Sequence, residues 1–295
     1  MNSLETTINK KSIVDLAIER IHLADQMSQR YMGAPIYVCI SGGKDSSVIQ
    51  QLVIDSGVEA VFIHHHTTVD APETVHFVRK EFKRLEKLGY KTKILYPKMS
   101  MWRLIEKHKG MPPTRLMRYC CAELKENSVY TDEGRAAFII TGVRWSESEK
   151  RKGRGEFEVL ANSKSDRIIL SNDNDVERKL FEDCKRKNER VCNPIIDWED
   201  DDVWRYIRDN HLPYNPLYDL GFARVGCIGC PMATPRQRAR QWEIWPKYKQ
   251  AYIAAIERGI AIGKAEGREY TFRCGEDALK FIDGTFNPNQ KELFE

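Results

Sequence analysis

Two groups of residues in this sequence are of types that carry chemistry, and each stands in a recognisable pattern. The first is a glycine-rich run between an apolar stretch and a helical stretch, Ser41-Gly42-Gly43-Lys44-Asp45-Ser46-Ser47. The second consists of cysteines: Cys120 and Cys121 are adjacent, and Cys227 and Cys230 form a C-x-x-C. The first group predicts an anion-binding loop, and the second predicts a metal or an iron–sulfur cluster.

The glycine-rich run has the composition of a phosphate-binding loop. Gly42 and Gly43 allow the backbone to turn tightly and approach an anion, and the helix that follows presents unpaired N–H groups. The serines add hydroxyl donors, and Lys44 adds a positive charge for phosphate oxygens. A carboxylate suits such a loop when a cation binds there too, so Asp45 predicts Mg²⁺. The spacing differs from that of a Walker A motif, and a serine-capped structural turn is the alternative.

The cysteines need a reason other than disulfides. The chain has 295 residues and eight cysteines, and a protein of this size in a reducing compartment neither needs nor keeps structural bridges. Cys39, Cys184, Cys192 and Cys274 stand alone. Single cysteines are most often small buried apolar residues, and we expect this of Cys39. The paired cysteines are different and predict a metal-binding role.

The elements that must position these groups follow an alternating order. Residues 11–30 predict an amphipathic helix that Gly33 and Pro35 stop, and residues 48–54 and 73–88 predict two more helices. Short apolar stretches predict strands at 36–40, 60–63, 94–96 and 138–141. A β-α-β-α-β order with non-alternating apolar strands predicts an open, mostly parallel α/β sheet sandwiched by helices.

Two regions depart from this alternation. Residues 144–192 are charged, which predicts a mostly exposed excursion with a short strand at 167–170. A helix is expected at 200–210, whose three leading aspartates suit the helix dipole better than a metal. Aromatic residues at helical spacing in 235–263 predict core packing. We therefore expect a main domain over 1–234 and a helical C-terminal region over 235–295.

Composition and charge limit the class of protein. There are 47 Lys+Arg against 43 Asp+Glu, and 41% of residues are hydrophobic, which fits neither a disordered chain nor a membrane protein. The N-terminal residues lack the apolar core of a secretory signal, so a cytoplasmic protein is expected. Between Arg79 and Lys125, 14 Lys+Arg face only 4 Asp+Glu. This local balance suits a polyanion such as DNA or RNA, with a solvated helix face as the alternative.

The loop and its context resemble a known enzyme family. SGGKDS after a strand resembles the pyrophosphate loop of the PP-loop ATP pyrophosphatases, of the adenine nucleotide alpha hydrolase-like superfamily. The stretch DAPET resembles the family segment beside the adenine pocket, which implies a metal or substrate contact for Asp70; a helix N-cap is the alternative. TGVRWSES resembles a loop whose arginine, here Arg144, meets phosphate. The resemblance implies ATP cleavage to AMP and diphosphate, with Lys44, Asp45 and Arg144 as catalytic residues.

The cysteine segments extend the likeness over residues 12–235. RYCCAELK and GCIGCP resemble the PAPS reductase-like branch of that superfamily, which implies that Cys120, Cys121, Cys227 and Cys230 hold one [4Fe–4S] cluster. Tetrahedral Zn²⁺ and plain thiols are the alternatives. Zinc sites usually space their ligands, so the adjacent cysteines favour the cluster.

Two departures from the true sulfonucleotide reductases favour ATP-dependent chemistry. Those enzymes carry a nucleophilic cysteine followed by histidine near the C-terminus, whereas Cys274 is followed by Gly275, Glu276 and Asp277. They also usually lose the full SGGKDS loop, which this chain keeps. The sequence thus predicts an ATP pyrophosphatase that activates DNA or tRNA for sulfur transfer, closest in kind to DNA-phosphorothioation (Dnd- and Ssp-type) subunits.

The partners that this interpretation implies are ATP, Mg²⁺ and a cysteine desulfurase as sulfur source, and a homo-oligomer is compatible with it. One alternative function is a sulfonucleotide reductase or a sulfate-adenylylating subunit. Another is a non-catalytic ATP-binding partner with structural zinc.

Overall fold

The computed structural model describes residues 11–125, 137–160, 168–170 and 189–286. They divide into two compact units. The first combines the residues before His65 with 77–93 and 128–215, and the second combines 65–76, 94–127 and the residues after Asn215. None of the helices among the described residues has both the length and the apolar character needed to cross a bilayer.

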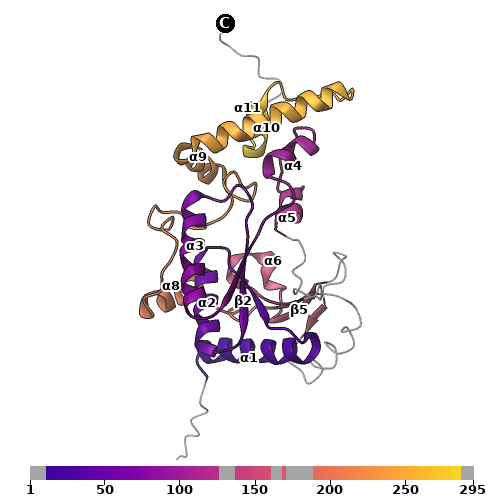
Figure 1. Ribbon diagram of the computed structural model, residues 1–295. Coiled ribbons are helices and arrows are strands. Elements are labelled where there is room, and N and C mark those ends of the chain that lie inside the picture. The colour runs from indigo at the N-terminus through magenta and orange to yellow at the C-terminus, as the bar shows by residue number, and fades with distance from the viewer. Residues whose placement is uncertain (1–10, 126–136, 161–167, 171–188, 287–295) are drawn as a thin grey trace, which may run out of the picture. The chain divides into compact units, whose positions relative to one another are not determined.

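A mostly parallel sheet forms the centre of the first unit (Figure 1). Its described strands follow the order β3-β2-β1-β4-β7-β5-β6. β1 pairs in parallel with β2 and with β4, and β4 pairs in parallel with β7, while β5 runs antiparallel to β7 and β6. The strands are β1 (Ile36–Cys39), β2 (Ala60–His65), β3 (Lys91–Leu95), β4 (Phe138–Ile140), β5 (Phe157–Leu160), β6 (Ile168–Leu170) and β7 (Glu189–Cys192). The predicted α/β class is confirmed.

Helices cover this sheet. α1 (Ile13–Met32) packs on β1, β4 and β7, α2 (Lys44–Ser56) packs on β1, and α8 (Asp200–Asp209) packs on α2. The first unit also holds most of α3 (Pro72–Lys87), the short turn η1 (Trp145–Glu147) and α6 (Glu149–Lys152). α1 begins with a capping box between Ser12 and Asp15 and ends at Gly33, whose φ of 60° is left-handed. The stop signal read from the sequence is therefore the observed one.

The described parts of the excursion over 144–192 are less exposed than predicted. The sequence prediction missed β5 and β7, which extend the sheet beyond β4. Their side chains include buried charges: Glu158 is 1% exposed and accepts from Arg154 Nε at 2.5 Å and from the Gly155 amide at 3.0 Å. Charged residues within these short strands interrupt the apolar runs that marked the other strands. β6 matches the expected strand from Ile168 onward, whereas 171–188, with Cys184, lies outside the described residues.

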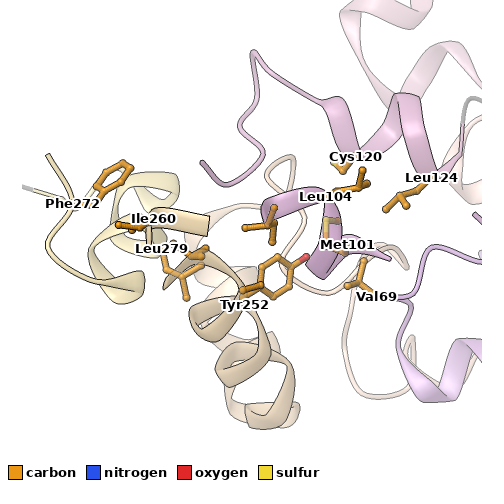
Figure 2. Packing of buried hydrophobic residues seen from close by; sticks show 13 residues of the cluster. Val69, Met101, Leu104, Cys120, Leu124, Tyr252, Ile260, Phe272 and Leu279 are labelled. Carbon is orange, nitrogen blue, oxygen red and sulfur yellow. The ribbon is translucent and has the colours of Figure 1, made fainter. Parts of the chain in front are cut away.

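The second unit is helical and encloses an apolar cluster (Figure 2). Its helices are α4 (Met101–Lys107), α5 (Tyr119–Leu124), α9 (Pro235–Ile244), α10 (Pro246–Ala265) and α11 (Gly275–Asp283). The expected helix at 235–263 is thus two helices, because Pro246 opens a new one. Tyr252 is 1% exposed and its ring lies 5.1 Å from that of Trp102. The predicted core role of the aromatic residues is confirmed there.

Candidate functional site

The glycine-rich loop lies where the strand order of the sheet reverses. It follows β1, which has β2 on one side and β4 on the other. In open α/β sheets ligands bind at such a point, outside the carboxyl ends of the strands. The loop after β4 reaches the same place, because a Cβ on Gly142 would lie 3.1 Å from the carbonyl carbon of Asp45. Residues 41–47 and 142–144 therefore form one site.

Backbone geometry holds the glycine-rich loop ready for an anion. Gly42 has a φ of 79°, and Gly43 is the N-cap of α2, whose first turn receives no side-chain cap. The helix begins at Lys44, earlier than predicted. Ser46 Oγ donates to the Gly43 carbonyl at 2.7 Å, and Ser41 Oγ accepts from the Gly43 amide at 3.3 Å. The serines thus shape the loop itself, and the first-turn N–H groups of α2 are available to an anion.

Two buried cations and two carboxylates meet beside this loop. Lys44 Nζ lies 2.9 Å from Asp200 Oδ1 and 3.3 Å from Asp45 Oδ2. Arg144 donates from Nε to Asp45 Oδ1 at 2.7 Å and from Nη2 to Asp200 Oδ1 at 2.8 Å. Lys44 is 6% exposed and Arg144 is 2% exposed. We call these four residues the charge cluster.

Electrostatics inside the charge cluster favour the ionised carboxylates. Partial burial alone would raise the pKa of Asp200, but hydrogen bonds and charge from Lys44 and Arg144 outweigh it and lower that pKa. The guanidinium of Arg144 also donates to Ser146 Oγ at 2.9 Å and to the Trp198 carbonyl at 3.2 Å. Lys44, Asp45 and Arg144, predicted from separate motifs, are therefore brought together.

Asp200 and Asn215 were missed as site residues. The aspartates 200–202 were assigned to the helix dipole, and the structure gives that capping role to Asp202, which forms a capping box with Glu199. Asp200 instead bridges Lys44 and Arg144. Asn215 is fully buried and donates from Nδ2 to the Gly42 carbonyl at 3.0 Å. Three consecutive acids exceed what one cap needs, and this was the available signal for Asp200.

Asp70 belongs to the second unit and closes a turn. Its carboxylate accepts from the Thr67 amide at 2.7 Å, from Thr67 Oγ1 at 2.8 Å and from His66 Nδ1 at 3.0 Å. Burial raises the pKa of Asp70, but these hydrogen bonds outweigh it and bring the pKa to about 2. Asp70 is not the N-cap of α3, because the Val75 amide bonds to the carbonyl of Ala71. A metal or substrate contact stays a prediction.

The turn that Asp70 closes adjoins the C-x-x-C segment. Asp70 forms an isolated antiparallel bridge with Cys227, and the Ile228 amide bonds to the Val69 carbonyl at 2.8 Å. Thr67 Oγ1 lies 3.5 Å from Cys227 Sγ. Asp70 therefore helps to fix the backbone that carries Cys227.

The paired cysteines converge within the second unit. α5 carries Cys120 and Cys121, and the loop before α9 carries Cys227 and Cys230. The pKa of Cys120 is raised by a hydrogen bond with Cys121, by burial and by the three neighbouring thiols. Lys125 lies close to the same thiols, because the negative charge of Cys227 raises the pKa of the Lys125 ammonium. We call these four cysteines the thiol quartet.

The composition of the thiol quartet bears on which inorganic group fits. Thiolates are the usual ligands of an iron–sulfur cluster. Four cysteines can also hold tetrahedral Zn²⁺, but the adjacent pair Cys120 and Cys121 favours the cluster, because zinc sites usually space their ligands.

The C-terminal helices hold the C-x-x-C loop. Gly229 has a φ of +71°, and a Cβ there would lie 2.5 Å from the Trp242 ring. Its amide donates to Gln241 Oε1 at 2.9 Å, and Tyr252 Oη donates to the Ile228 carbonyl at 3.0 Å. Arg238, 2% exposed, donates to the Cys230 carbonyl at 3.2 Å. Residues of α9 and α10 are therefore the scaffold of the thiol quartet.

The unpaired cysteines differ from one another. Cys192 is buried, Cys39 is half-buried, and Cys274 is exposed. Cys274 is the N-cap of α11 and lines a shallow cavity of about 250 Å³ with Glu257, Lys264 and Arg273. The expectation of a buried apolar cysteine concerns Cys39, which is only half-buried.

Comparisons with known proteins identify relatives of this chain. An uncharacterised protein of Methanocaldococcus jannaschii is 30% identical over 228 residues, which are 76% of this chain and 48% of the relative, so the chain spans about half of that protein. An adenosine 5'-phosphosulfate reductase of Bacillus cereus is 25% identical over 204 residues, 69% of this chain and 76% of the enzyme. A crystal structure of phosphoadenylyl-sulfate (PAPS) reductase from Candida auris is 18% identical and covers 75% of this chain and 96% of its own, with a TM-score of 0.42.

A family model extends over most of the site. The model of the phosphoadenosine phosphosulfate reductase domain matches residues 35–233. This range contains the glycine-rich loop, the charge cluster and all four cysteines of the thiol quartet. The chain therefore belongs to the phosphoadenosine phosphosulfate reductase domain family.

Proposed function

We propose that the chain is an ATP pyrophosphatase that adenylylates an acceptor for sulfur transfer. The observation that carries this proposal is the intact loop Ser41–Ser47 beside two buried cations, Lys44 and Arg144. A terminal diphosphate is the ligand whose charge matches such a site, because α2 offers N–H groups and the cations offer charge-assisted hydrogen bonds.

The chemistry that follows is nucleotidyl transfer. An oxygen of the acceptor attacks the α-phosphorus of ATP, the bond from that phosphorus to the bridging oxygen breaks, and diphosphate leaves with the electron pair. Lys44 and Arg144 stabilise the charge on the departing diphosphate, and Asp45 orients Arg144 through its bond to Nε. Mg²⁺ would bind phosphate oxygens together with Asp45. A sulfur nucleophile then displaces AMP from the acceptor.

The thiol quartet would hold a [4Fe–4S] cluster in this proposal. Its all-thiol donor set, with two adjacent cysteines, supports the cluster over zinc. When bound, such a cluster supplies electron transfer or a site for sulfur. The sulfur source would be a cysteine desulfurase, and the acceptor would be DNA or tRNA, as in phosphorothioation or thiolation systems, since the stretch Arg79–Lys125 is strongly basic.

A second candidate function is sulfonucleotide reduction. Relatives such as the Bacillus cereus enzyme bear the name adenosine 5'-phosphosulfate reductase. This favours sulfonucleotide reduction at least as strongly as ATP-dependent sulfur transfer. Such a reductase needs a nucleophilic thiol, and the candidate is Cys274, exposed beside Glu257 and Glu276.

One set of assays separates the two functions. The anaerobically purified chain is incubated with [α-³²P]ATP and Mg²⁺, with and without DNA or tRNA, and in parallel with adenylyl sulfate and a thiol. We expect AMP and diphosphate from ATP, with Lys44→Ala lowering the rate about 10²- to 10³-fold. Release of ADP would contradict the proposal. Sulfite formation that Cys274→Ser abolishes would establish the reductase instead.

The cluster is tested by analysis of the same preparation. We expect about four irons and four acid-labile sulfides per chain, with Cys120→Ser, Cys121→Ser, Cys227→Ser or Cys230→Ser each lowering both. Cys39→Ser and Cys274→Ser are the matched controls and should keep them. Stoichiometric zinc without sulfide, from iron-replete cells, would favour the structural alternative.

A further inference from the structure

We propose that Asp200 is a built-in competitor for the terminal phosphates of the ligand, a carboxylate that neutralises Lys44 and Arg144 until a polyphosphate displaces it. The inference rests on the proposed function, because it names the group that a diphosphate must replace. It concerns binding at the charge cluster and not the fate of the bound nucleotide.

The geometry gives Asp200 the position that a phosphate oxygen would take. A single oxygen, Oδ1, lies 2.9 Å from Lys44 Nζ and 2.8 Å from Arg144 Nη2. These are the distances of charge-assisted hydrogen bonds to an anionic oxygen. One acceptor bridging a lysine and an arginine is the arrangement that a phosphate oxygen makes between two such donors.

Burial separates the competitor from the groups it covers. The side chains of Lys44 and Arg144 are 8% and 2% exposed, whereas that of Asp200 is 60% exposed. The cations are therefore fixed within the protein, and the carboxylate lies on their solvent side. Rotation of the Asp200 side chain into water would uncover both donors without breaking the core.

The second carboxylate of the cluster is held differently. Asp45 bonds Arg144 at Nε, and its side chain is 21% exposed. It follows Lys44 at the start of α2, so it is part of the loop itself. Asp45 thus orients the guanidinium, while Asp200 occupies the remaining Nη2 donor. Only Asp200 combines exposure with bonds to both cations.

The consequence concerns both binding and release. An internal anion weakens the apparent affinity for every ligand that must displace it, and it returns as the product departs. Without it, diphosphate should bind more tightly and leave more slowly. If Asp200 served only to position the cations, its loss would instead weaken binding, because Lys44 and Arg144 would lose a partner.

The experiment measures binding of inorganic diphosphate by calorimetry, without turnover. We expect Asp200→Asn to tighten the dissociation constant about tenfold, equal to about 1.4 kcal/mol. Asp201→Asn removes the same charge from the same exposed first turn and should change it less than about twofold. Asp200→Glu restores an anion and should return the affinity toward that of the wild type.

The outcomes separate this inference from the proposed function. Weaker or unchanged diphosphate binding in Asp200→Asn, with a wild-type urea midpoint, would overturn the competitor role. Should that variant unfold, Asp200→Ser takes its place with the same expectation. If ATP gives ADP, or only adenylyl sulfate turns over, the proposed function fails while the tightening of diphosphate by Asp200→Asn is still measurable.

Discussion

The side-chain amide of Asn215 donates to the carbonyl oxygen of Gly42 at 3.0 Å, across 173 positions of sequence. Gly42 is the residue with the left-handed φ of 79° in the glycine-rich loop, and Asn215 is fully buried. Asn215 is also the last residue of the first unit, from which the chain continues towards Cys227. One buried amide at the end of the first unit thus fixes the phosphate loop, and the chain that follows it leads to the thiol quartet.

Replacing Asn215 should disturb the glycine-rich loop while the chain still folds. Asn215→Ala leaves the Gly42 carbonyl without this donor, which costs about 1–3 kcal/mol for a buried polar group. We expect the free energy of unfolding to fall by that amount. We expect the free energy of ATP binding to weaken by at least as much. Urea unfolding and calorimetry measure the two. An unchanged ATP affinity in the folded variant would show that the bond does not shape the nucleotide site.

The C-x-x-C loop should be intolerant of a methyl group at Gly229. Its φ is +71°, and the added Cβ would approach Trp242 to 2.5 Å and Tyr252 to 2.9 Å. We expect Gly229→Ala to displace the loop and to lower the metal content of the purified protein severalfold. Gly226→Ala is the matched control, since nothing lies within 4 Å of a Cβ there. Equal metal contents in the two variants would contradict this role for Gly229.

Arg144 should not be replaceable by lysine. Its guanidinium bonds Asp45, Asp200, Ser146 and the Trp198 carbonyl from three nitrogens, which one ammonium cannot reproduce. Arg144→Lys keeps the charge but leaves some of these buried acceptors without a donor, so it should lower the free energy of unfolding by about 1–3 kcal/mol. Urea unfolding checks this. As a control, Arg151 is half-buried and pairs with Glu147. Arg151→Lys should change the free energy of unfolding by less than about 1 kcal/mol.

Acid should weaken the second unit through Asp70. Its pKa is about 2 in the folded chain against an ordinary 3.8, so the stability it contributes is complete above pH 3.8 and is lost as the pH falls towards 2. The shift corresponds to about 2 kcal/mol. Asp70→Asn should therefore flatten the pH dependence of unfolding in that range, measured by urea titration at several pH values. A dependence as steep as that of the wild type would exclude Asp70 as its source.

Much of the fold follows from local pattern. Buried parallel strands such as Ile36–Cys39 read as apolar runs, and left-handed caps such as Gly33 and Gly57 mark the ends of helices in the sequence. The sequence pattern did not predict strand β7, because half of its residues, Glu189 and Arg190, are charged. Arg190 is nevertheless only 2% exposed. Burial of a charge depends on partners elsewhere in the chain, which a local pattern cannot reveal.

The site was predictable where one motif contains it. Lys44, Asp45 and Arg144 were named from their own segments, but their mutual bonds depend on the sheet order that brings the ends of β1 and β4 together. Asp200 and Asn215 come from segments with a sufficient local explanation, a helix start and a turn. Their contacts with the loop are tertiary, so only the folded chain reveals them.

If the acceptor is a nucleic acid, its affinity for the chain should depend on salt concentration. Lys80, Lys83 and Lys87 are exposed on α3, whereas Arg84 pairs with the buried Glu81 at 3.0 Å and is less free to meet phosphate. If α3 contacts DNA, the logarithm of affinity should fall linearly with the logarithm of salt concentration. Changing the three lysines to glutamine should reduce that slope by about 0.9 for each lost phosphate contact and leave ATP binding unchanged. Glutamine at the exposed Lys247, Lys264 and Arg268 removes the same charge elsewhere and should preserve the slope. Equal slopes for both triple variants would place the acceptor away from α3, and the absence of any salt-dependent binding would favour a small sulfonucleotide substrate.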